Sequence, residues 1–419
     1  MAVTTTTPPN TLAPFRLGKY GFYLLLICLT SYVLESPIKY ALGKAHISPI
    51  IYGRDAYAAL VVMIAFASWM SGKSFSAAIP ATFVLVAHAF YGMLIQGSLI
   101  QPVIGLKLYL AFLLGMASYS TFRDKQGLMI RWYLAMYVLT VIGVCINWAT
   151  DMPWAGETFE SAVGATEVSR EWTTGGIRRL AGFAKASFDA STIVVTFGAA
   201  LALYPGLSRW IQLLLLLTST GVVVLTTSKG SMLALVVIAL YIGLRRQQEN
   251  RLNASFYVAP AAMLLIPLLL FAFEFKATVH GDLWFLLSSF AERINWMWPR
   301  AFGNLGSLEG AILGRGVGGI GFPQRFGEGL IYNSADNVMV YLFVSFGLAA
   351  LIYVYITLNK LRTAAPHITP YIWSCLICWL LYWIFYGFTT NLIENPLFSF
   401  FVGLIFGAAY TPPIKRVHE

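Results

Sequence analysis

The chain has 419 residues, of which 58% are hydrophobic and only 11% are charged. Soluble domains carry about 25% charged residues, so this composition excludes a water-soluble surface, and it is also too apolar for a disordered chain. The apolar residues occur in blocks of roughly 15–22, the length at which a helix crosses ~30 Å of hydrocarbon. The sequence therefore predicts an all-α polytopic membrane protein.

The formal net charge is +10, which in a soluble protein would suggest a nucleic-acid partner. In a membrane protein the same excess follows from the retention of Lys and Arg on the cytoplasmic side, so no nucleic-acid partner is expected. The four cysteines all fall in apolar segments: Cys28, Cys145, Cys375 and Cys378. Cys375 and Cys378 have the spacing of a metal site or a redox pair, but they lie in an apolar stretch without a polar partner, so we expect helix-packing residues rather than ligands.

In chain order, residues 1–19 are expected to form a cytoplasmic tail, and about twelve transmembrane helices follow. Helices one to five are expected within 20–149, six to nine within 188–273 and ten to twelve within 337–410, with residues 411–419 as a second cytoplasmic tail. The individual spans are predicted at 20–34, 56–71, 75–95, 103–121, 132–149, 188–204, 210–226, 231–244, 256–273, 337–358, 371–388 and 397–410. One alternative stays open, since residues 210–244 also fit one long helix.

The distribution of Lys and Arg predicts the orientation. With the N-terminus in the cytoplasm, the inside segments hold fourteen basic residues against three acidic ones, whereas the outside segments hold thirteen against fifteen. The first span lacks a small-residue cleavage site, which is typical of a retained anchor. We therefore expect a multi-pass protein of the cytoplasmic (inner) membrane with both termini in the cytoplasm.

Two segments on the expected outer side are long: residues 150–187, between spans five and six, and residues 274–336, between spans nine and ten. Their basic residues are Arg170, Arg178, Arg179, Lys185, Lys276, Arg293, Arg300, Arg315 and Arg325. Long segments are usually functional or disordered, and their tryptophans within amphipathic stretches favour folded structure at the interface. No internal repeat is found, so the signature of an inverted-repeat transporter is absent.

The run Gly314–Gly319 fits the pattern G-x-G-x-x-G, but a dinucleotide site needs a preceding strand and a following helix within a βαβ unit. We reject that interpretation for an outer loop of a membrane protein. The run is either a tight glycine turn or a place where backbone N–H groups and Arg315 approach an anion.

Polar residues at two outer helix ends are the other candidates. Asp336 and Asn337 begin the span at 337–358, where they are either ordinary helix N-caps or, for Asp336, a general base beside arginines that hold an anion. Lys229 lies in a very short outer turn, where it either snorkels to the interface or serves function. No histidine has the spacing of a catalytic triad or a metal site.

Three stretches together resemble the O-antigen ligase and Wzy-type polysaccharide polymerase superfamily. They are Arg179-Leu-Ala-Gly182-Phe183, then Thr227-Ser-Lys-Gly230-Ser, and a third that runs from Arg293-Ile-Asn-Trp296 through Leu313-Gly-Arg-Gly316 to Ser334-Ala-Asp-Asn337. The resemblance covers roughly residues 175–360, and the order, spacing and outer-face placement of the motifs carry it.

The resemblance implies a membrane glycosyltransferase that acts on undecaprenyl-diphosphate-linked glycans without nucleotide sugar, cofactor or metal. By motif match, Arg179, Lys229 and Arg293 would hold the donor diphosphate on the periplasmic face, with Arg315 as a further anion contact. The family usually has arginine where this chain has Lys229, and lysine keeps the charge but lacks the bidentate guanidinium fork.

Asp336-Asn337 stands where the O-antigen ligases have His-Asn, and the Asp-Asn form looks more like polymerases of exopolysaccharide or O-antigen repeats. The resemblance then implies that Asp336 accepts the proton of the acceptor hydroxyl and that Asn337 orients it. Membrane lipid and a chain-length regulator are the implied partners. The alternatives are a ligase that transfers the glycan to lipid A-core and a transporter of the lipid-linked oligosaccharide.

Overall fold

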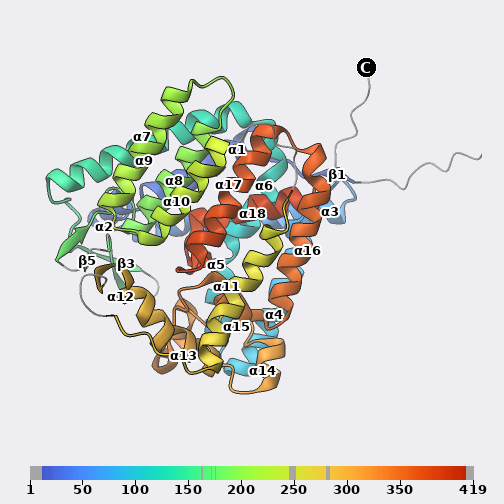
Figure 1. The fold of residues 1–419 in the computed structure, drawn as a ribbon. Helices are drawn as coiled ribbons and strands as arrows, with labels where there is room; N and C mark the ends of the chain where they lie inside the picture. Colours follow the sequence, from blue (N-terminus) through green and yellow to red (C-terminus); the bar gives the residue numbers. More distant parts are fainter. Residues whose placement is uncertain are drawn as a thin grey trace, which may run out of the picture.

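The structure, a computed structural model, describes residues 12–411 except 162–163, 171, 175, 245–251 and 280–283. Most of the two predicted cytoplasmic tails lies outside the described residues. The same holds for three arginines that are predicted to lie on the cytoplasmic side, Arg245, Arg246 and Arg251. Within the described ranges the chain is mostly helical, as the sequence predicts (Figure 1).

The first seven helices precede the first long outer segment. They are α1 (Lys19–Val33), α2 (Glu35–Lys44), α3 (Gly53–Met70), α4 (Ala78–Gln96), α5 (Ile100–Leu108), α6 (Leu110–Asp124) and α7 (Gln126–Ala149). Four helices lie between the two outer segments: α8 (Ser187–Ala202), α9 (Arg209–Leu225), α10 (Lys229–Leu244) and α11 (Ser255–Ala272). The break between α9 and α10 shows that residues 210–244 are not one long helix.

The second outer segment forms the short helices α12 (Trp284–Glu292), α13 (Trp298–Gly303) and α14 (Leu308–Leu313), with a π-helical turn at Arg293–Met297. Figure 1 shows α13 and α14 at the lower end of the bundle and α12 to the left of α11. The last four helices are α15 (Val338–Phe346), α16 (Ala349–Ala364), α17 (Pro370–Gly387) and α18 (Pro396–Tyr410).

Among the residues that the structure describes, six helical segments are long and apolar enough to cross a membrane, or eight if each of two bent pairs counts as one span. Four shorter apolar helices accompany them: α8, α9, α10 and α18. Each of the twelve predicted spans therefore coincides with helical structure. The helices α8, α9, α10 and α18 are each too short to cross a membrane by themselves.

The prediction of one continuous helix over 337–358 is wrong, because α15 and α16 meet at an angle of 118°. The last carbonyls of α15 accept hydrogen bonds from the glycine-rich loop instead of from a following turn: Arg315 N donates to Val344 O (2.7 Å), and Gly316 N donates to Ser345 O (2.9 Å). Gly347 follows with a φ of 60°, a left-handed conformation that favours glycine. Hydropathy cannot detect this break because both halves are apolar.

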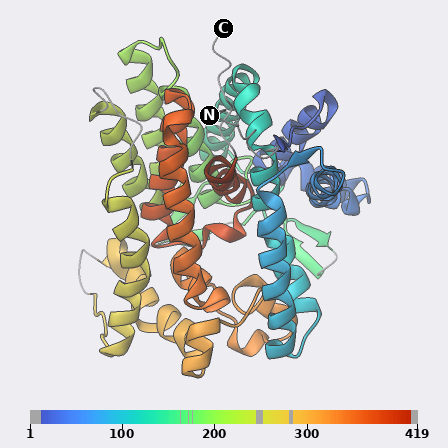
Figure 2. The same cartoon turned by 90° about the vertical axis from the view of Figure 1, so that its right-hand side faces the viewer.

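The centre of the bundle is formed by α6, α17 and α18, and α18 crosses it next to α16 (Figure 2). The backbones of α6 and α18 approach closely at two glycines. A Cβ atom on Gly115 would lie 2.1 Å from Phe400 O, and one on Gly403 would lie 2.1 Å from Phe112 O. Small residues at a helix crossing allow this tight packing inside a membrane.

The first outer segment contains two β-hairpins, which the sequence did not predict. Strand β3 (Thr158–Ser161) pairs with β4 (Gly164–Glu167), and β5 (Trp172–Thr174) pairs with β6 (Ile177–Arg179). A short pair, β1 (Ala13–Pro14) with β2 (Ser74–Phe75), lies elsewhere in the fold.

Helix α2 packs against this segment and contacts β3. The buried Glu35 carboxylate pairs with Lys39 (2.6 Å) and with Arg54 (3.0 Å), so its charge is compensated inside the protein. The neighbouring Ser36 hydroxyl donates to Ala184 O (2.8 Å), and Ser36 N donates to Phe183 O (3.1 Å). The chain that follows β6 is thus fixed against α2.

Candidate functional site

Arg179, the last residue of β6, is held against the turn that carries Lys229. Its Nε donates to Thr226 O (3.5 Å), and Leu180 N donates to Leu225 O (3.4 Å). The Arg179 guanidinium also lies 5.2 Å from the centre of the Trp172 ring. These contacts join the first outer segment to the end of α9, so two residues far apart in the sequence share one site.

The motif after Arg179 is anchored on α7. Asn147 Oδ1 accepts hydrogen bonds from Ala181 N and Gly182 N (3.1 Å each). Gly182 has a φ of 61°, and a Cβ atom there would lie 2.7 Å from the backbone of Gly143. Only glycine fits this close approach, which explains why the motif contains one at this position.

Lys229 is the first residue of α10 and precedes the predicted span at 231–244. Its pKa lies below the usual value, mainly because the ammonium group is partly desolvated and further because Arg179 and Arg293 repel its charge. The pKa of Arg179 is lowered as well, first by burial, while Tyr386 opposes the shift and Arg293 adds to it. We call Arg179, Lys229 and Arg293 the basic cluster.

Arg293 begins the π-helical turn and forms an ion pair with Asp336. Its Nη2 donates to Asp336 Oδ2 (2.9 Å), and its Nη1 donates to Ser289 O (2.6 Å). The Arg293 side chain is 15% exposed and that of Asp336 is 26% exposed, so the pair is reachable but largely shielded from solvent. The structure therefore brings together four of the six predicted site residues.

Asp336 is held in a strained backbone. Ala335 and Asp336 both have left-handed conformations, with φ of 61° and 43°, although neither is glycine. Asn333 Oδ1 accepts from Ala335 N (2.7 Å) and helps to fix this turn. Strain of this kind persists only where the surroundings impose it, and it is concentrated at functional sites.

Asn337 is a helix N-cap, as one of the two interpretations predicts. Its Oδ1 accepts from Met339 N (2.9 Å) and Val340 N (3.1 Å), and its Nδ2 donates to Met263 O (2.9 Å). The residue is fully buried. Both ends of the amide are engaged inside the protein, so the implied role of Asn337 in orienting an acceptor hydroxyl has no support from its surroundings.

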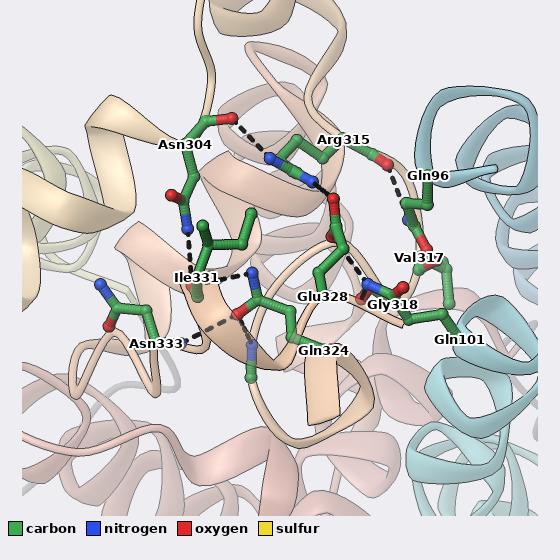
Figure 3. A network of polar contacts seen from close by, with 11 residues as sticks. Gln96, Gln101, Asn304, Arg315, Val317, Gly318, Gln324, Glu328, Ile331 and Asn333 are labelled. Atoms are coloured by element: carbon green, nitrogen blue, oxygen red, sulfur yellow. Dashed lines mark hydrogen bonds and ion pairs between the residues drawn. The ribbon is translucent and has the colours of Figure 1, made fainter. Parts of the chain in front are cut away.

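Arg315 is not part of the basic cluster. Figure 3 shows its guanidinium between two partners: Nη1 donates to Asn304 O (2.7 Å), and Nη2 forms an ion pair with Glu328. Gln101 Nε2 donates to the second Glu328 oxygen (2.8 Å), which completes a network between α5 and the glycine-rich loop. The place of the predicted substrate anion beside Arg315 is thus taken by the Glu328 carboxylate of the protein itself. Arg315 instead fixes the loop whose backbone bonds to the end of α15, where the chain bends toward α16.

Three charged residues that the sequence did not select lie beside the cluster. Arg325 stacks 4.5 Å from the centre of the Tyr332 ring, and Arg170 stacks 3.9 Å from that of Trp172. Burial lowers the pKa of Arg170, whereas Tyr332 raises it and Arg325 lowers it further, so the two outer segments meet at this point. The third is Glu394, in the turn between α17 and α18, whose pKa burial raises to about 7. The sequence marks Arg170 and Arg325 only as basic residues of the long outer segments, and nothing in it singles out Glu394.

An apolar cavity of about 240 Å³ lies among the helices. It is bounded by α4, α6, α15, α16, α17 and α18, and its lining includes Ala81, Phe112, Leu342, Tyr353, Trp383 and Ile393. Leu392 and Ile393, which line the cavity, directly precede Glu394 in the chain. The cavity therefore reaches the turn that carries Glu394, and its lining suits an alkyl or isoprenoid chain.

In the described part of the chain, no three His, Cys, Asp or Glu side chains are grouped so that they could hold a metal ion. The two cysteines with metal-like spacing, Cys375 and Cys378, are buried on α17. No model of a known protein family matches the chain. No curated protein matches it either.

Proposed function

We propose that the protein is a polysaccharide polymerase of the O-antigen ligase and Wzy-type superfamily. It would transfer an exopolysaccharide or O-antigen glycan from undecaprenyl diphosphate to a sugar hydroxyl of another lipid-linked repeat. The observation that carries the proposal is the convergence of Arg179, Lys229 and Arg293 from three separate segments. Three like charges repel one another, and a bound diphosphate would relieve that repulsion.

The apolar cavity adds a second, independent support. A polyprenyl diphosphate has a long hydrocarbon tail and a strongly anionic head, so its binding site needs an apolar slot that ends at basic groups. The cavity has no charged lining residue, and its lining includes Leu392 and Ile393, which directly precede Glu394 in the chain. The charges next to Glu394 include Asp336, the partner of Arg293.

The proposed reaction needs electrostatic stabilisation more than protonation of the leaving group. The acceptor oxygen attacks the anomeric carbon, a new C–O bond forms, and the bond from that carbon to the phosphate oxygen breaks with its electron pair. The basic cluster stabilises the charge that develops on the diphosphate. In-line attack inverts the anomeric centre, and the hydroxyl proton passes to a carboxylate, for which the sequence singles out Asp336.

We further propose twelve spans in the inner membrane, with both termini in the cytoplasm and the basic cluster on the periplasmic face. The second outer segment would lie between spans nine and ten. In this arrangement the bent pair α15–α16 is span ten, and the short helices α8, α9, α10 and α18 count as spans six, seven, eight and twelve.

A ligase that transfers the glycan to lipid A-core uses the same donor chemistry and differs only in the acceptor. Membrane extracts supplied with lipid-linked repeats distinguish the two: ladders formed without lipid A-core indicate a polymerase, and a requirement for lipid A-core indicates a ligase.

A deletion strain tests the proposal in cells. We expect single repeats to replace polymer in that strain, and we expect the wild-type gene, but not its Arg293→Ala or Asp336→Ala variant, to restore polymer. Normal polymer in the deletion strain would contradict the proposal. A transporter would instead be indicated if both variants kept polymer assembly in a reconstituted assay while lipid movement was lost.

A further inference from the structure

Glu394 is held by a backbone cradle at the outer end of the bundle. It closes the 3₁₀ turn Leu392–Glu394 between α17 and α18, and its Oε1 accepts a hydrogen bond from Phe322 N (2.8 Å). Gly321, just before Phe322, has a φ of 80°, and a Cβ atom there would lie 2.2 Å from Glu394 Oε1. The glycine leaves room for this one carboxylate oxygen.

The surroundings of Glu394 differ from those of an ordinary buried acid. Among the residues that the structure describes, no basic side chain forms an ion pair with it, and its side chain is only partly buried by the surrounding protein. Burial raises its pKa to about 7, the Phe322 N–H opposes that shift, and the negative charge of Asp336 adds to it. The titratable and charged groups that act on it are Asp336, Arg325, Lys185, Tyr332, Tyr109 and Tyr341.

Two carboxyl groups thus share one site in contrasting environments. Asp336 Oδ2 is engaged by the Arg293 guanidinium at 2.9 Å, whereas Glu394 is held only through a backbone N–H. Where two neighbouring carboxyl groups have such different environments, they usually have different roles in proton transfer. An ion-paired carboxylate suits the positioning of a guanidinium, and a desolvated one suits proton exchange near neutral pH.

We propose that Glu394 is the group that removes the proton from the acceptor hydroxyl, while Asp336 holds Arg293 in the basic cluster. This inference rests on the proposed function. In the step, the acceptor oxygen forms its bond to the anomeric carbon, the diphosphate leaves with the electron pair of the broken bond, and the hydroxyl proton is transferred to the Glu394 carboxylate and then to water.

The position of Glu394 suits this role. Leu392 and Ile393 line the apolar cavity, so the next residue along the chain lies at the level where a lipid tail would meet its diphosphate head. The anomeric carbon of the donor is attached to that diphosphate. A base at this level can reach the hydroxyl that attacks the anomeric carbon.

The test compares Glu394→Gln, Glu394→Asp and Asp336→Asn in the purified full-length protein. The substrate is the lipid-linked repeat extracted from the deletion strain, turnover is measured from pH 5 to 9, and binding of undecaprenyl diphosphate is measured separately. Glutamine keeps an oxygen that can accept from Phe322 N, so Glu394→Gln is expected to fold, which its melting temperature in detergent checks.

Because the carboxylate form accepts the proton, wild-type turnover should fall as the pH decreases through about 7. We call this decline of turnover toward acidic pH the acid limb. In Glu394→Gln, turnover should fall by about 100-fold or more and the acid limb should disappear. The variant should bind undecaprenyl diphosphate as the wild type does. Glu394→Asp should retain part of the turnover and keep an acid limb. Asp336→Asn should bind undecaprenyl diphosphate more weakly but keep an acid limb, which should move to lower pH because the negative charge of Asp336 no longer raises the pKa of Glu394.

Wild-type turnover with an intact acid limb in Glu394→Gln would overturn the inference, and so would loss of the limb in Asp336→Asn alone. A wild-type protein that neither binds undecaprenyl diphosphate nor extends the lipid-linked repeat at any pH would overturn the proposed function itself.

Discussion

Arg178 and Arg179 are adjacent in β6 but occupy different environments. Arg179 contacts Thr226 O and the Trp172 ring and interacts with Arg293 and Lys229, whereas Arg178 forms an ion pair with the well-exposed Asp151 at the surface. Because successive side chains of a strand point to opposite faces, this pair offers a matched comparison of one arginine inside the basic cluster and one outside it.

We expect Arg179→Ala to weaken the binding of undecaprenyl diphosphate by about tenfold to 100-fold, since hydrogen bonds to charged groups contribute about 1.5–3 kcal/mol. Arg178→Ala should leave the affinity unchanged, because exposed ion pairs contribute little. Binding of the labelled lipid to the purified protein measures both. Equal loss in the two variants would show that net charge, rather than the basic cluster, holds the lipid.

At the scale of residues, the sequence predicted four of the charged groups that meet, but it also selected Arg315, which does not join them, and it did not predict how each group is engaged. Arg179, Lys229, Arg293 and Asp336 were selected because they lie in outer loops or at outer helix ends, a property that can be read along the chain. Arg293 and Arg315 could not be distinguished in this way, because their acidic partners, Asp336 and Glu328, are brought to them by tertiary packing.

At the scale of elements, the junction between α15 and α16 links the glycine-rich loop to the site. A Cβ atom on Gly347 would lie 2.1 Å from Ile312 O, and Leu348 N donates to the same carbonyl (3.0 Å). The junction turns the chain by 118°, so α16 does not continue the direction of α15, and Asp336 and Asn337 directly precede the first residue of α15. The position of Asp336 therefore depends on the geometry at Gly347.

Gly347→Ala should destabilise the protein by about 2 kcal/mol or more. The added Cβ atom would clash with the backbone, and alanine would be strained at the positive φ of this position. Gly221→Ala in the middle of α9 is the matched control. Nothing lies within 4 Å of a Cβ atom there, so it should be neutral or slightly stabilising. Thermal unfolding in detergent measures both changes, and unchanged stability of Gly347→Ala would contradict the structure at this junction.

The existence of the helices could be predicted from the sequence because hydropathy reports burial in lipid segment by segment. The bend at Gly347 could not, since it depends on hydrogen bonds between segments far apart in the chain. The bonds from Arg315 N and Gly316 N to the end of α15 are of this kind. The β-hairpins at 158–179 pair neighbouring strands of only three or four residues, which is too short for a clear alternation of apolar and polar residues.

At the scale of the whole molecule, we propose that the apolar cavity and the basic cluster hold the two parts of one lipid. Ala81 on α4 lines the cavity, whereas Ala67 on α3 is exposed on the surface of the bundle. A larger side chain at Ala81 would narrow the cavity without a change of charge, and the same substitution at Ala67 is a matched control.

Ala81→Phe should weaken the binding of undecaprenyl diphosphate by about tenfold or more, because the tail loses buried methylene groups at about 0.8 kcal/mol each. Geranyl diphosphate, with its short tail, should bind Ala81→Phe and the wild type alike. Ala67→Phe serves as the control and should bind both lipids normally. Equal weakening of both lipids in Ala81→Phe would mean that the cavity does not hold the tail.

The most direct test of the central claim is polymer formation by the purified protein in liposomes. The only substrate supplied is the lipid-linked repeat extracted from the deletion strain, with no nucleotide sugar and no lipid A-core, and the products are separated by length on a gel. The account predicts a ladder of products that differ by one repeat and a matching release of undecaprenyl diphosphate. A single unextended band with no release of undecaprenyl diphosphate would contradict it.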